Sequence, residues 1–134
     1  MSAPAHTVLG AAQGPAVVVL DGIRASGLGD EAHVAAVRAG VRLVVPHLAS
    51  DLRVLVDALG LGEVGLLARG AGVAHAVAAL AALGSRVRAV SFLGPLPEHV
   101  LTPRELPLTV WPVDPDRGPT LSLYDAALRF CAPS

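Results

Sequence analysis

The chain has 134 residues, a hydrophobic fraction of 53% and a formal net charge of −1, which fits one folded domain and argues against disorder. Its ten basic residues are all arginines and form no cluster, so neither DNA nor RNA is an expected partner. The lone cysteine, Cys131, excludes an internal disulfide, and no apolar run approaches the roughly 18 residues of a membrane span. The N-terminal residues lack the basic and apolar regions of a secretion signal, so we expect a cytoplasmic protein without membrane contact.

Short apolar runs alternate with helical patterns along the chain. The first run, 16–20, is continuous and rich in β-branched residues, as in strands that are buried on both faces of a parallel sheet. Glycine or proline ends most of the later runs. The predicted strands are 16–20, 41–45, 64–68, 87–93 and 108–111, and the predicted helices are 32–39, 51–59, 73–83 and 121–130. This alternation predicts the α/β class, with one doubly wound, three-layer domain over residues 1–134 and a five-stranded parallel sheet.

Several segments resemble the α/β-hydrolase superfamily. Residues 51–60 are similar to the helix that precedes the nucleophile strand in that family, and residues 64–72, V-G-L-L-A-R-G-A-G, are similar to the strand and elbow with the motif Gly-x-Ser-x-Gly. Residues 18–22, V-V-L-D-G, resemble the strand of the oxyanion loop, which usually ends in His-Gly, and residues 106–111 resemble the strand before the acid of the triad. The resemblance implies a truncated α/β-hydrolase-like core whose five strands lie in the flavodoxin-like order second-first-third-fourth-fifth.

The chain departs from this family at the nucleophile. Gly70 stands where the resemblance places the serine, and glycine adopts the strained elbow backbone but offers no hydroxyl. The histidine base of the family follows one further strand, which this sequence does not reach before Ser134. Because losing one triad member typically costs about 10⁴ or more in rate, we expect no triad hydrolysis.

The elbow segment is also a candidate binding site. Gly70, Ala71 and Gly72 come at the start of a predicted helix, where backbone N–H groups favour an anion. Arg69 adds a cation beside them, and Gly22 follows the strand of the oxyanion loop. These five residues predict a site for a small anionic ligand, without a cofactor. The simpler alternative is that the glycines only permit a tight turn.

Three polar residues follow other predicted strands. Asp21, His47 and Asp116 would face the same edge of the sheet, where two carboxylates could bind a cation or share a proton. They define an alternative hypothesis, an active enzyme of the hydrolase or lyase type, although turn-forming aspartates and a histidine without a role explain them more simply. Ser26 is a weak candidate for a displaced nucleophile. His75 is expected to face solvent, and it also replaces the third glycine of a dinucleotide fingerprint, which disfavours a nucleotide-binding module.

The sequence therefore predicts a catalytically degenerate domain that binds a small molecule or an anion, or another protein. No pair of histidines has the spacing of metal ligands and the lone cysteine does not support a Cys–His site, so no metal is expected. A homodimer is expected because residues 41–45 and 108–111 would be the two edge strands of the sheet. Pro107 and Pro112 flank the second of these strands and oppose pairing there.

Overall fold

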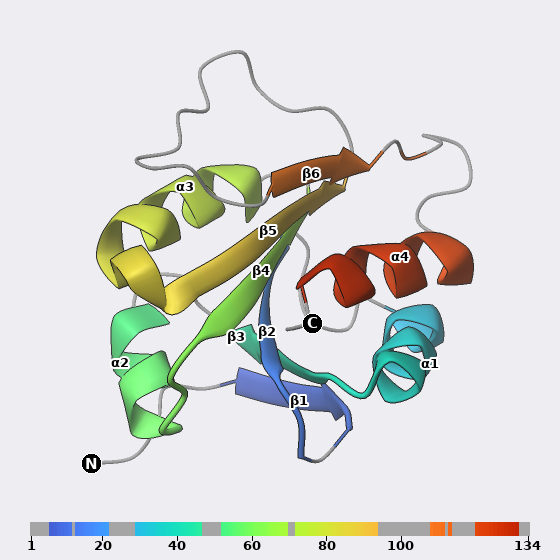
Figure 1. Cartoon of the computed structure of the whole chain (residues 1–134), viewed down its shortest axis with the longest axis horizontal. Helices are drawn as coiled ribbons and strands as arrows, with labels where there is room; N and C mark the ends of the chain where they lie inside the picture. The colour runs from blue at the N-terminus through green and yellow to red at the C-terminus, as the bar shows by residue number, and fades with distance from the viewer. Residues whose placement is uncertain are drawn as a thin grey trace.

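The computed structural model describes residues 6–11, 13–21, 29–46, 52–69, 72–93, 108–111, 113 and 120–131, and the fold that they form is shown in Figure 1. The strands are β1 His6–Gly10, β2 Ala16–Asp21, β3 Arg42–Pro46, β4 Val64–Arg69, β5 Val87–Leu93 and β6 Leu108–Trp111. The helices are α1 Gly29–Ala39, α2 Leu52–Ala58, α3 Gly72–Leu83 and α4 Leu121–Cys131, with a short 3₁₀ helix, η3, at Gly84–Arg86.

The six strands form one sheet in the order β1-β3-β2-β4-β5-β6. Strands β2 to β6 are mutually parallel and lie in the predicted order second-first-third-fourth-fifth. The prediction of five parallel strands is wrong in one respect, because β1 pairs antiparallel with β3. A strand with one neighbour needs less apolar sequence than a central strand, and β1 has no fully buried residue. Because β1 pairs with β3, residues 41–45 are not at an edge of the sheet. The prediction that they form an edge strand is therefore wrong.

Helices cover both faces of the sheet, which gives the three predicted layers (Figure 1). Side chains alternate between the faces along each strand, so Val18 and Leu20 belong to the core cluster on the side of α2 and α3, whereas Val17 and Val19 belong to the cluster on the side of α1 and α4. Alanine lines much of the helical side of these contacts, as in α1, where the buried residues are Ala32, Ala35 and Ala36. Small side chains let the helices lie close to the sheet.

Helix α4 lies especially close to β4 at Gly65. A Cβ atom added to Gly65 would be 2.7 Å from Cβ of Cys131 and 2.9 Å from its carbonyl oxygen, so the last turn of α4 rests directly on the strand backbone. Opposite Gly65 the register between β4 and β5 shifts, which indicates a β-bulge near Arg88. This close contact requires a glycine at residue 65. No local pattern in the sequence indicates this requirement.

Candidate functional site at the carboxyl edge of the sheet

The carboxyl ends of four parallel strands lie side by side. Asp21 of β2 is in register with Arg69 of β4, Arg69 with Leu93 of β5, and Leu93 with Trp111 of β6. The strand order changes direction between β2 and β4, and ligands of open α/β sheets bind at the carboxyl edge, next to such a point. Arg69 therefore lies at the location where the fold favours a ligand site.

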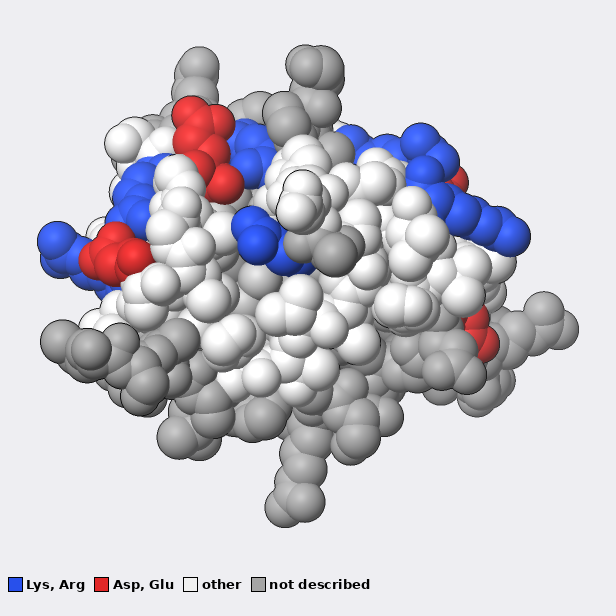
Figure 2. Space-filling view, turned by 90° about the horizontal axis from the view of Figure 1, so that it is seen from below, with Lys and Arg blue, Asp and Glu red and all other residues white. Residues whose placement is uncertain are grey.

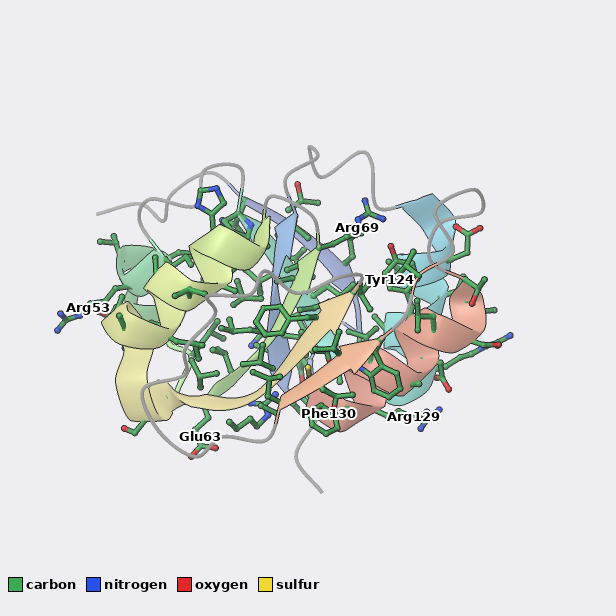
Figure 3. All side chains as sticks on the ribbon, turned by 90° about the horizontal axis from the view of Figure 1, so that it is seen from above. Arg53, Glu63, Arg69, Tyr124, Arg129 and Phe130 are labelled. Atoms are coloured by element: carbon green, nitrogen blue, oxygen red, sulfur yellow. The ribbon has the colours of Figure 1, made fainter. Side chains whose placement is uncertain are left out.

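The guanidinium of Arg69 is held by a tyrosine from α4. Its Nη1 donates a hydrogen bond to Oη of Tyr124 over 3.3 Å, and the two side chains lie beside each other in Figure 3. Tyr124 is 2% exposed, so its ring is fixed in the core and its hydroxyl reaches the rim where Arg69 is half-buried. This hydrogen bond orients the planar guanidinium of Arg69 at the end of β4.

The start of α4 fixes the height of Tyr124 above the sheet. Oγ1 of Thr120 accepts a hydrogen bond from the amide of Leu123 over 3.2 Å, which is the geometry of an N-cap. The carbonyl oxygen of Thr120 also accepts the amide hydrogen bond of Tyr124 over 3.0 Å, closing the first turn of the helix. The capped first turn brings the phenol of Tyr124 to the end of β4.

A buried polar cluster fixes the middle of α4 on the sheet. Ser91 of β5 is fully buried and donates its hydroxyl proton to the carbonyl oxygen of Ala127 over 3.0 Å. The same oxygen, Oγ, accepts hydrogen bonds from Nε1 of Trp111 over 3.1 Å and from Sγ of Cys131 over 3.4 Å. Burial raises the pKa of the Cys131 thiol to about 11, so this thiol is a structural donor rather than a nucleophile.

Arg88 fixes the far end of α4. Its Nε donates to the carbonyl oxygen of Cys131 over 2.8 Å, and its Nη2 donates to the carbonyl oxygen of Ala16 over 2.9 Å. Burial lowers the pKa of the Arg88 guanidinium from its ordinary value, and the charges of Cys131 and Glu63 oppose that shift. A cation at a helix C-terminus interacts favourably with the helix dipole. Helix α4 is therefore anchored at both ends and in its middle, which makes Tyr124 a rigid partner for Arg69.

The structure describes only part of the predicted site. Arg69 lies at the predicted edge, the main chain of Asp21 is its register neighbour, and Gly72 is the first residue of α3. His75 is exposed on α3, as expected. The remaining candidates, Gly22, Ser26, His47, Gly70, Ala71 and Asp116, lie outside the described residues.

Tyr124 is the residue of this site that the sequence did not indicate. The sequence predicts helix 121–130 but gives Tyr124 no role in the site. A single tyrosine among apolar neighbours has no signature of its own, and its partner is 55 residues away in the sequence. The buried position at which its hydroxyl meets a cation follows from the packing of α4 on β4.

Solved structures with a similar backbone include epoxide hydrolases and an α/β hydrolase. An epoxide hydrolase from Vigna radiata matches with a TM-score of 0.57 and 21% identity, over 67% of this chain and 35% of that protein. An α/β hydrolase from a sediment metagenome of the Mar Chica lagoon, Morocco, matches with a TM-score of 0.58 and 21% identity, over 66% and 47%. A laboratory-evolved variant of potato epoxide hydrolase matches with a TM-score of 0.56 and 18% identity, over 66% and 35%.

The chain has an α/β-hydrolase-like fold. The resemblance to α/β hydrolases is thus confirmed at the level of the fold. The α/β-hydrolase-like chain spans between about a third and a half of the length of these enzymes, and at these identities the likeness concerns the fold alone. No protein-family model and no curated protein matches the sequence.

In the part of the chain that the structure describes, no three or more His, Cys, Asp or Glu side chains are grouped so that they could hold a metal ion. None of its helices has the length and apolar character needed to cross a membrane. The candidate site is the contact between Arg69 and Tyr124 at the carboxyl end of β4.

Proposed function

We propose that this α/β-hydrolase-like domain performs no acyl transfer and binds a small anionic ligand at the carboxyl edge of its sheet, through Arg69. The sequence supports the first part, because Gly70 directly follows β4 where the resemblance calls for a nucleophilic serine. The second part rests on the contact between Arg69 and Tyr124 at the same strand end.

The contact with Tyr124 supports binding because it orients the cation. Arginine recognises carboxylates and phosphates through a planar set of N–H donors, and a guanidinium held in one orientation loses less rotamer entropy when it binds. Arg69 is half-buried, and this strengthens a hydrogen bond from its guanidinium to an anion, because the surrounding protein has a lower effective dielectric constant than water. A ligand at this position would also approach the residues that open α3, where backbone N–H groups favour negative charge.

Binding is tested by titrating the ¹⁵N-labelled protein with inorganic phosphate and with acetate at constant ionic strength, followed by NMR. We expect saturable shifts at residues around the end of β4. Arg69→Gln should lower the affinity at least about tenfold, which corresponds to 1.4 kcal/mol. Tyr124→Phe should lower it less, because the cation remains but is no longer oriented.

Arg53→Gln is the matched control for this experiment. Arg53 is an exposed arginine on α2, far from Arg69 in Figure 3, so its substitution removes the same charge elsewhere. Equal affinities for wild type and Arg69→Gln, or equal losses in Arg69→Gln and Arg53→Gln, would contradict binding at this site. The second result would show only a non-specific effect of net charge.

The absence of acyl transfer is tested separately. A fluorophosphonate probe should leave the native protein unlabelled, and hydrolysis of activated esters should stay at the level of a denatured sample. Stoichiometric labelling would refute this part and would identify the nucleophile. Ester turnover that disappears in Asp21→Asn would instead favour the alternative of an active enzyme built on the carboxylates of the rim.

A further inference from the structure

The last residue of β1 lies directly on α1. A Cβ atom added to Gly10 would be 2.6 Å from Cβ of Ala36 and 2.6 Å from the carbonyl oxygen of Val41, so no side chain fits there. The φ angle of Gly10 is +81°, in the left-handed region that favours glycine. The next amide, that of Ala11, donates to the carbonyl oxygen of Val41 over 2.9 Å. The end of β1 is therefore packed against α1 and against the residues that follow this helix.

A histidine of α1 adds a hydrogen bond to the same glycine. The amide of Gly10 donates to Nδ1 of His33 over 2.9 Å, and His33 is one turn before Ala36 on the helix. His33 makes no other hydrogen bond or ion pair with the part of the chain that the structure describes. The residue is exposed, so it exchanges protons with the solvent. Two successive turns of α1 thus hold Gly10, one by packing and the other by a hydrogen bond.

This hydrogen bond requires a neutral imidazole. Nδ1 accepts a hydrogen bond only when it carries no proton, so the proton of neutral His33 must be on Nε2. In the imidazolium form both ring nitrogens are donors, and the N–H at Nδ1 would face the N–H of Gly10. Histidine is the side chain whose charge ordinarily changes between about pH 5 and 8. The contact between β1 and α1 therefore depends on the protonation of one atom of His33.

The other ionisable groups around α1 are placed less well to act on this contact. Helix α1 packs against β1, β3 and α4. Besides His33, the titratable or charged residues of these four elements are Asp30, Glu31, Arg38, His6, Arg42, Tyr124, Asp125, Arg129 and Cys131. His6 is at the opposite end of β1, and Asp125 and Arg129 pair with each other. Asp30 precedes His33 by three residues, a spacing at which helical residues are neighbours, so it enters the test below.

The surface around β1 carries charges of both signs. Figure 2 views the molecule from the side on which Figure 1 draws β1, and basic and acidic side chains lie beside each other on this face. Neighbouring charges of opposite sign partly cancel, so no large field of one sign acts here. The hydrogen bond to Gly10 is therefore the specific interaction through which His33 senses pH.

We propose that His33 is an acid-sensitive latch of β1, in which the neutral imidazole holds Gly10 on α1 and protonation releases the end of the strand. The neutral form makes the bond, so the latch is closed above the pH range in which His33 takes up its proton and opens below it. Among the described strands β1 is outermost and pairs only with β3, so its end can open without disturbing the central strands. The latch is independent of ligand binding at Arg69, which lies at the end of β4.

The test is solvent exchange of the Gly10 amide, measured by NMR from about pH 5 to about pH 8 and corrected for the exchange of an unstructured peptide. We expect protection of this amide to fall about fivefold toward acid, the effect of losing one exposed hydrogen bond. His33→Asn should keep the high protection at every pH, because Oδ1 of asparagine accepts a hydrogen bond and does not titrate. His33→Leu should show the low protection at every pH, because it offers no acceptor.

Two variants serve as matched controls. His75 is an exposed histidine on α3, and His75→Asn should leave the pH dependence of the Gly10 amide unchanged. Asp30→Asn should also leave it unchanged, and loss of the pH dependence in this variant would assign the response to the carboxylate and overturn the proposal.

The tautomer of His33 provides a measurement that needs no variant. At about pH 8 the ¹⁵N chemical shifts of the ring should show Nδ1 without a proton. A proton on Nδ1 of the neutral ring overturns the proposal, because that nitrogen could not accept the amide of Gly10. Protection of Gly10 that does not change with pH, or that still changes in His33→Asn, overturns it as well.

Discussion

Replacing Gly65 with alanine should destabilise the fold by displacing α4. The new methyl group would lie 2.7 Å from Cβ of Cys131 and 2.9 Å from its carbonyl oxygen, and both distances are shorter than such contacts allow. The methyl group cannot be accommodated by a side-chain rotation alone, because the carbonyl belongs to the helix backbone and also accepts the hydrogen bond of Arg88. The last turn of α4 must therefore move away from β4.

The magnitude follows from two opposing effects. Overpacking a close contact costs about 1–3 kcal/mol, and the upper part of this range applies because backbone must move. Alanine also reduces the entropy of the unfolded chain, which returns about 0.5 kcal/mol. The free energy of unfolding should thus fall by about 2 kcal/mol, which lowers Tm by roughly 8 °C for a domain of this size.

Urea denaturation followed by circular dichroism and by the fluorescence of Trp111 measures this change. Trp111 is the only tryptophan of the chain, and the centroid of its ring is 6.3 Å from that of Phe130 on α4. Its fluorescence emission therefore reports on how α4 packs against the sheet. Gly62→Ala is the matched control, because a Cβ atom there would meet nothing within 4 Å. A Gly65→Ala protein within about 0.5 kcal/mol of wild type would refute the close contact between α4 and β4.

Three further predictions concern the anchoring of α4 and of the loop before β4. Because burial raises the pKa of the Cys131 thiol from 9.0 to about 11, the unfolded chain loses this proton first, so the free energy of unfolding should fall as the pH rises from about 9 to 11. Urea melts at several pH values should show this slope in wild type but not in Cys131→Ala, and an equal slope in both would contradict it. Ser91→Ala removes one buried donor to a helix carbonyl and the acceptor of two other bonds, and should cost about 1–3 kcal/mol by urea denaturation, whereas Ser85→Ala, at an exposed position, should cost almost nothing. Arg86 donates to two loop carbonyls as well as to Asp57, so Arg86→Ala should cost about 1–2 kcal/mol, more than Asp57→Asn, which removes only an exposed ion pair. Equal losses in the last two variants would show that the ion pair, rather than the loop contacts, is what matters.

The sequence predicted the central sheet because its signals are local. Continuous apolar runs, such as 16–20 and 87–93, reflect strands buried on both faces, and the glycines and prolines between elements mark turns whatever the rest of the fold does. The strand order required the resemblance to α/β hydrolases, since periodicity does not show which strands are neighbours. Strand β1 escaped prediction because an edge strand, with one neighbour, needs no apolar run.

For the candidate site, the sequence determined the location but not the partners. Arg69 was identified because it ends a central strand next to a glycine-rich turn, and both features lie within a few residues of each other. Tyr124, Ser91 and Gly65 acquire their roles only when α4 packs on the sheet, through contacts between residues 36 to 66 positions apart in the chain. Strands and turns are encoded by neighbouring residues, so the sequence alone predicts them. The buried hydroxyl of Ser91, the fixed phenol of Tyr124 and the glycine beneath α4 depend on distant segments, so only the tertiary structure decides their roles.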